Sequence, residues 1–91
     1  MPPEDLVYIA TALRIDLQCD LLTWEGMGRV IDAMEARGHR LLLQRRKGNR
    51  WRACFRPCPV DPFGEGLPCA VASAALAALQ ELERETFQDT F

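Results

Sequence analysis

The chain has 91 residues and a mass of 10.3 kDa, which is enough for one small domain. A composition that is 48% hydrophobic and 26% charged excludes a disordered chain. The net charge of −2 excludes both a strongly basic DNA-packaging protein and a strongly acidic mimic of nucleic acid. We expect one domain over residues 1–91, with a helix and connector in 1–22, a core in 23–85 and a tail in 86–91.

Two helices are predicted in the first part of the chain. The first covers residues 4–17, where apolar residues recur at helical spacing: Leu6, Ile9, Ala10, Leu13 and Leu17. The second covers residues 23–38, with Thr23 as its N-cap, Gly38 directly after its end, and an apolar stripe of Met27, Val30, Ile31 and Met34. Gly26 and Gly28 weaken its first turn, so we expect another segment of backbone to approach closely there.

After Gly38 the apolar period changes from 3.6 to 2, which predicts two antiparallel strands over 39–46 and 50–56. Lys47, Gly48 and Asn49 suit the tight turn between them. Alternation places one set of side chains in the core: Leu41, Leu43, Trp51, Ala53 and Phe55. It places another set on the exposed face: Arg40, Leu42, Gln44, Arg46, Arg50, Arg52, Cys54 and Arg56.

The proline-rich segment 57–68 is predicted to be a loop with an edge strand near residues 60–63. The last helix begins at Pro68 and runs to about residue 85, with a core stripe of Val71, Ala75, Leu79 and Leu82. The fold class is therefore α+β, a small antiparallel sheet of two or three strands packed against helices in the order α-α-β-β-(β)-α.

Positive charge is concentrated in the predicted hairpin. Residues 37–56 hold eight cations and no acid, while the rest of the chain has a net charge of −10. The eight cations are the predicted binding residues: Arg37, Arg40, Arg45, Arg46, Lys47, Arg50, Arg52 and Arg56. Seven of them are arginines, which form planar, bidentate pairs with carboxylates and phosphates.

The sequence offers little support for catalysis, a cofactor or a metal. His39 is the single histidine, which argues against a Ser-His-Asp or Cys-His site. Cys54, Cys58, Cys69 and His39 could hold zinc, and Cys54 and Cys58 could form a disulfide, but the spacing lacks paired CxxC motifs. Acidic residues stand where a signal peptide needs basic ones, and the apolar runs are too short to span a membrane. We therefore expect reduced, inert thiols in a cytoplasm.

Three elements carry a resemblance to a known family. They are the amphipathic helix from Thr23, the strand Trp51-x-Ala53-x-Phe55, and the segment Gly64-Glu65-Gly66-Leu67-Pro68 that enters an alanine-rich helix. Together they resemble the phage ABA sandwich family of small phage and prophage domains. The resemblance implies a phage-type origin and a fold, and it supplies no catalytic residues.

The element order and Ala74-Ala75-Leu76 also resemble the double-stranded RNA-binding domain. That domain carries lysines at the start of its last helix, where this chain has Pro68, Cys69, Ala70 and Val71. The departure argues against binding to duplex RNA.

We therefore expect a non-enzymatic, phage-type protein that acts in the host cytoplasm. It would dock its arginine-rich hairpin, or its acidic helical surface, on a host protein or ribonucleoprotein complex. An anti-defence inhibitor of the anti-CRISPR kind, or a host-takeover inhibitor, is the specific form. The alternatives are a nucleic-acid-binding accessory protein that uses the hairpin and a homodimer held by opposite charges. No membrane partner is expected.

Overall fold

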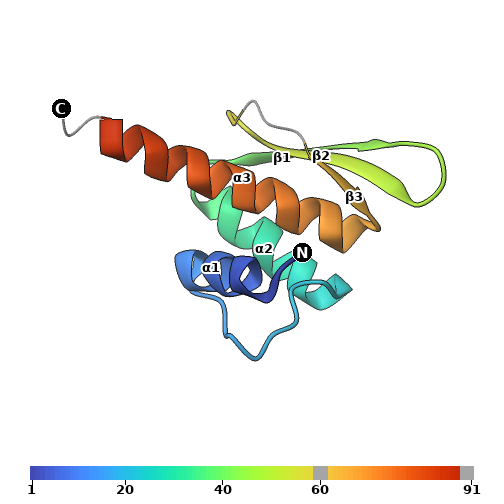
Figure 1. Cartoon of the computed structure of the whole chain (residues 1–91), viewed down its shortest axis with the longest axis horizontal. Coiled ribbons are helices and arrows are strands. Elements are labelled where there is room, and N and C mark those ends of the chain that lie inside the picture. The colour runs from blue at the N-terminus through green and yellow to red at the C-terminus, as the bar shows by residue number, and fades with distance from the viewer. Residues whose placement is uncertain (59–61, 89–91) are drawn as a thin grey trace.

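The computed structural model describes residues 1–58 and 62–88, which form three helices and a three-stranded antiparallel sheet. Figure 1 shows the sheet on one side of the molecule, α3 (Leu67–Gln88) against it, and α1 (Pro3–Leu13) on the far side of α3. The predicted α+β class and element order are confirmed. No helix in the described part of the chain is both long and apolar enough to cross a membrane.

The first helix ends four residues earlier than predicted. Arg14 adopts a left-handed conformation (φ 57°, ψ 40°), and its N–H donates to the Thr11 carbonyl at 3.3 Å. The N–H of Ile15 donates to the Ala10 carbonyl at 2.8 Å. These two bonds make a Schellman motif, which stops the helix. Leu17, the last apolar residue of the predicted helix, consequently lies outside the helix and is 64% exposed.

The second helix, α2 (Trp24–Ala36), begins and ends where the sequence predicts. The Thr23 hydroxyl accepts a hydrogen bond from the Gly26 N–H at 3.1 Å, and Gly38 (φ 87°) follows the helix in a second Schellman motif. A Cβ on Gly26 would lie 2.1 Å from the Asp20 carbonyl oxygen, so the expected close approach is confirmed there. It is wrong for Gly28, where an added Cβ would meet nothing within 4 Å.

The sheet has the order β1-β2-β3. β1 (Arg40–Arg45) pairs with β2 (Arg50–Arg56), which in turn pairs with β3 (Phe63–Glu65). The third strand therefore starts at 63, later than the predicted range 60–63, of which residues 60 and 61 lie outside the described part of the chain. Pro62 has no N–H for a ladder, which explains why β3 begins after it.

The last helix starts at Leu67 and continues three residues past the predicted end at 85. Residues 86–88, predicted to be part of a frayed tail, are helical, and 89–91 lie outside the described residues. After Pro68 in its first turn, the helix contains no proline or glycine that would end it. The end of α3 extends beyond the sheet (Figure 1), so Leu82, predicted to be buried, is 38% exposed.

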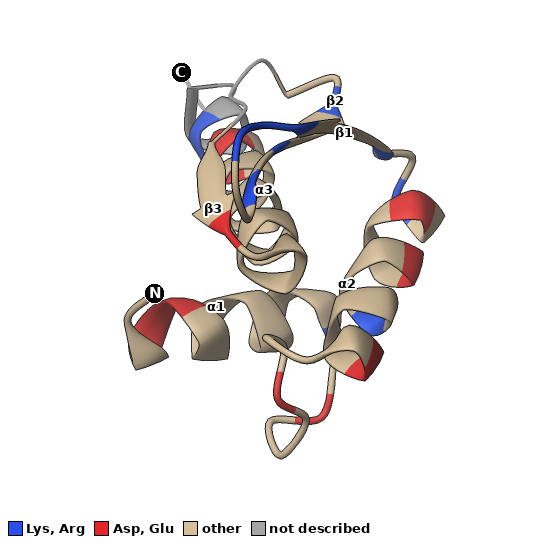
Figure 2. Ribbon diagram, turned by 90° about the vertical axis from the view of Figure 1, so that its right-hand side faces the viewer, with Lys and Arg blue, Asp and Glu red and all other residues tan. Residues whose placement is uncertain are grey.

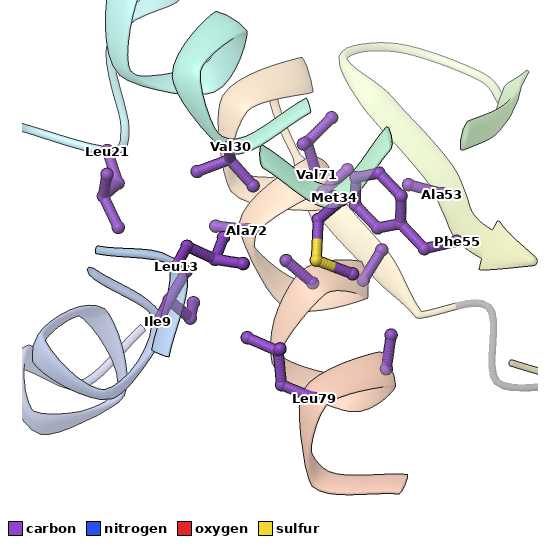
Figure 3. Packing of buried hydrophobic residues seen from close by; sticks show 14 of the residues in the cluster. Ile9, Leu13, Leu21, Val30, Met34, Ala53, Phe55, Val71, Ala72 and Leu79 are labelled. Atoms are coloured by element: carbon purple, nitrogen blue, oxygen red, sulfur yellow. The ribbon is translucent and has the colours of Figure 1, made fainter. Parts of the chain in front are cut away.

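Side chains from all three helices and from β2 meet in one apolar cluster, as Figure 3 shows. The largest fully buried side chains are Ile9, Val30, Met34, Phe55 and Val71. A Cβ on Gly64 would lie 2.4 Å from the backbone nitrogen of Ala70, so glycine lets α3 pack directly on β3. The helices therefore cover one face of the sheet. No described helix lies on the other face, where the segment after β2 covers Cys54, whose Sγ donates to the Cys58 carbonyl at 2.9 Å.

Candidate binding surface on the sheet

The strand register assigns each side chain to one of the two faces of the sheet. Leu41 opposite Phe55, and Leu43 opposite Ala53, lie on the face that the helices cover. The uncovered face carries the alternate positions of β1 and β2: Arg40, Leu42, Gln44, Arg50, Arg52, Cys54 and Arg56. The register therefore gives the predicted division into two faces, but two side chains differ from the prediction in burial. Leu43, predicted to be in the core, is 43% exposed, because β1 is an edge strand of the sheet. Cys54, predicted to be exposed, is 4% exposed, because the chain after β2 folds back over it and the Cys58 carbonyl accepts a hydrogen bond from its Sγ.

Phe63 of β3 lies on the uncovered face, because it is the register partner of Arg52. Three guanidinium groups surround its ring, with Cζ-to-centroid distances of 4.5 Å for Arg52, 5.7 Å for Arg50 and 5.9 Å for Arg46. A cation over an aromatic face is attracted by the ring quadrupole. The ring is still 45% exposed, so it is available to a partner.

Five of the eight predicted binding residues thus share one surface. We call this surface the cationic sheet face and define it by Phe63 and five arginines: Arg40, Arg46, Arg50, Arg52 and Arg56. Leu42, which is 43% exposed, lies on the same face.

The other three predicted cations lie elsewhere. Arg45 is on the opposite face, with its Cζ 5.9 Å from the centroid of the Trp51 ring. Arg37 donates from its guanidinium to the Ala12 carbonyl and so ties the end of α2 to α1. Lys47 is exposed in the turn between β1 and β2.

Charge is segregated in space as well as in sequence. Figure 2 shows most of the basic residues along the hairpin, and acidic ones on α1, on α2, on the segment between them, on β3 and on α3. Within residues 1–58 and 62–84, Arg40, Arg46, Arg50 and Arg56 form no ion pair with an acid. Glu65 is the one acid in β3, opposite Arg50 in the register. These four arginines therefore carry positive charge that no acid of the described residues neutralises by direct contact.

Sequence reasoning missed two exposed aromatic residues. The sequence places Phe63 in an edge strand but does not predict on which face of the sheet its ring lies, because that depends on how β3 pairs with β2. Trp24 stands three residues before Met27, in line with the apolar stripe of α2, which indicates a buried side chain. It is nevertheless 69% exposed, because it occupies the first turn of the helix.

The four cysteines and His39 were the other candidate ligands in the sequence. All four cysteines are thiols, and Cys54 Sγ donates to the Cys58 carbonyl at 2.9 Å. His39 is 7% exposed, and its Nδ1 has no hydrogen-bond partner in the described part of the chain. No three His, Cys, Asp or Glu side chains of the described residues come together as metal ligands.

A second surface feature is a groove of about 660 Å³ between α1 and α3. Its apolar residues include Val7, which is 52% exposed, and Leu82. The Tyr8 hydroxyl donates to Glu83 Oε2 at 2.7 Å and connects the two helices along the groove. This hydrogen bond to a carboxylate raises the pKa of Tyr8, and partial burial and the negative charge of Glu83 raise it further.

Comparison of the chain with protein-family models, with curated proteins and with solved structures found no match. The resemblances to the phage ABA sandwich family and to the double-stranded RNA-binding domain therefore remain predictions. The function has to be inferred from the geometry of the chain.

Proposed function

We propose that the chain is a non-enzymatic binding protein that docks its cationic sheet face on an acidic surface of another protein. The observation that carries the proposal is the exposed ring of Phe63 with three guanidinium groups within 6 Å of its centroid, on a sheet face that no described helix covers. By covering a functional surface of its partner, such a protein would inhibit by occlusion and would need no catalytic chemistry of its own.

The composition of the face favours a protein as the partner. Arginine and aromatic residues are enriched in the energetically dominant parts of protein interfaces, and lysine is depleted there. The cationic sheet face contains five arginines and no lysine, and it adds Leu42 and Phe63 as exposed apolar side chains. A partner that contacted this face only through phosphate groups would make no use of the exposed apolar side chain of Leu42.

A second candidate function is binding to single-stranded nucleic acid. The aromatic residues of β2 point into the core, but Phe63 lies outside it, among arginines. Bases stack on exposed aromatic rings and on guanidinium planes, and arginines beside them hold the phosphates. This observation favours a nucleic-acid-binding accessory protein that uses the same face.

The narrower form of the first proposal is a phage-type inhibitor that acts in the host cytoplasm on a defence or transcription complex. The strong separation of charge supports an inhibitor that recognises an acidic site from a distance, because such a face steers association. The phage origin rests on the family resemblance of the sequence.

The two candidates can be separated by capture from bacterial lysate with and without nuclease treatment. The probes are the intact chain, the variant Arg46→Ala/Arg50→Ala/Phe63→Ala, and the matched control Arg29→Ala/Arg84→Ala, which removes two positive charges from helices. A discrete protein retained after nuclease treatment by the intact chain and the control, and lost by the triple variant, supports the first proposal.

Retention of single-stranded DNA or RNA that weakens steeply with salt, again lost only in the triple variant, supports the second candidate. Equal capture by the intact chain and the triple variant overturns both.

A further inference from the structure

The groove between α1 and α3 and the hairpin turn of the same chain have complementary properties. The groove has an apolar floor that includes Val7, Leu79 and Leu82, and it carries the carboxylates of Glu4 and Glu83. The Arg37 guanidinium also lies in the lining, where it donates to the Ala12 carbonyl inside the groove. A side chain that enters the groove therefore meets apolar surface with two carboxylates and one guanidinium beside it.

The turn between β1 and β2 presents the matching charges. Arg46, Lys47 and Arg50 lie at this end of the hairpin, and Figure 1 shows the turn projecting past the helices. Arginine and lysine have long apolar stems below their charged ends, which allows the stems to cover an apolar floor while the charges reach carboxylates. The ring of Phe63 beside Arg46 and Arg50 adds apolar area at the same place.

We propose that one copy of the chain inserts its hairpin turn into the α1–α3 groove of a second copy. The turn and the groove lie on opposite sides of the molecule: in both Figure 1 and Figure 2, α3 lies between the sheet and α1. The turn therefore cannot occupy the groove of its own chain. The contact is head-to-tail, and each added copy leaves a free turn at one end and a free groove at the other.

This self-association does not depend on the proposed function, but it would compete with it. The arginines at the turn belong in part to the cationic sheet face, so a copy that is bound to a groove cannot dock on another macromolecule. Dissociation of the chains would then be the step that exposes the docking face. Because the contact depends on opposite charges near the surface, salt should weaken it.

The decisive measurement is sedimentation velocity of the full chain and of three variants. The turn variant is Arg46→Ala/Arg50→Ala, and the groove variant is Glu4→Gln/Glu83→Gln, which keeps the size of both side chains. The matched control is Asp32→Asn/Glu35→Gln, which removes two exposed acids from α2 outside the groove. Circular dichroism of each variant checks that its fold is intact.

We expect the intact chain to form species larger than a dimer at about 50 mM salt and to be monomeric at about 500 mM, where screening is strong. Each of the turn and groove variants alone should be monomeric under both conditions. An equimolar mixture of the two should stop at a dimer, because only one intact turn and one intact groove remain in each pair. The control should behave like the intact chain.

The inference is overturned if the intact chain is monomeric at low salt, or if the mixture of the two variants does not assemble. It is also overturned if the control variant self-associates as weakly as the groove variant. Failure of the self-association can be distinguished from failure of the proposed docking function. The groove variant keeps the cationic sheet face, so it captures the docking partner whenever the proposed function is correct, whatever the oligomeric state.

Discussion

The guanidinium of Arg52 stacks on the ring of Phe63, with Cζ 4.5 Å from the ring centroid, and the two residues face each other across β2 and β3. This contact holds a long, flexible side chain in one place on the surface of the sheet. Ordering such a side chain on binding normally costs about 0.5–1.5 kcal/mol. The sheet therefore presents a partly preorganised cation to a partner.

Replacement of Phe63 should separate binding from stability. Phe63→Ala removes the ring that positions three guanidinium groups, so we expect affinity for the captured partner to fall at least about tenfold, as for a central interface aromatic. The ring is 45% exposed, so the free energy of unfolding should change by less than about 1 kcal/mol. Titration with the captured partner and denaturant unfolding measure the two effects.

The variant Phe63→Tyr is the control, because it keeps an aromatic ring and should retain most of the affinity. An affinity that is unchanged in Phe63→Ala would show that the ring does not contribute to binding.

Gly26 and Gly28 should respond in opposite directions to substitution by alanine. At Gly26 the new Cβ would overlap the backbone of Asp20 and Leu21, so Gly26→Ala should destabilise the chain by about 1–3 kcal/mol or more. At Gly28 the space is open, and Gly28→Ala should stabilise α2 by about 1 kcal/mol through helix propensity. Urea unfolding of both variants tests the pair, and a change of the same sign in both would contradict it.

Local signals in the sequence were sufficient for most of the fold. Thr23 and Gly38 mark the two ends of α2, because both act through hydrogen bonds to neighbouring backbone. The alternation of side chains along β2 predicts the two faces of the sheet without knowledge of the other elements. The end of α1 was missed because the left-handed residue that ends a helix is usually glycine, whereas in this chain it is Arg14. The exposure of Leu82 was missed because periodicity does not tell how far the neighbouring elements extend.

The candidate site was predictable only in part. Arg40, Arg50, Arg52 and Arg56 follow from alternation within two strands that are adjacent in the sequence. The place of Phe63 depends on the pairing of β3 with β2 across a proline-rich segment, which no local pattern specifies. Arg37 was assigned to the site by its charge alone, whereas its hydrogen bond to Ala12 depends on how α1 packs against α2.

Arg14→Gly should stabilise the chain. A residue other than glycine in the left-handed region is strained by about 1–2 kcal/mol, and relief of this strain is partly offset by the greater freedom of glycine in the unfolded chain. We expect a net gain of about 0.5–1 kcal/mol in the free energy of unfolding. Arg14→Ala is the control, since it removes the same charge and keeps the strain. Equal effects of the two variants would show that the backbone conformation is not the cause.

The hydrogen bond between Tyr8 and Glu83 should be visible in the titration of the tyrosine. Tyr8 is the single tyrosine of the chain, so tyrosinate absorbance reports on it alone. The bond to the carboxylate raises the pKa of Tyr8 above the ordinary value of 10.0. Because the folded-state pKa is the higher one, the interaction stabilises the protein fully below pH 10.0 and is lost as the pH rises through the raised pKa.

Glu83→Gln removes the negative charge and weakens the acceptor, so the midpoint of the tyrosine titration should move back toward 10.0. Glu81→Gln is the matched control, because Glu81 lies two residues away and pairs with Arg84 at 3.9 Å. It should leave the midpoint where it is in the intact chain. A midpoint that is at 10.0 in the intact chain, or that moves equally in both variants, would mean that α1 and α3 are not joined by this bond in solution.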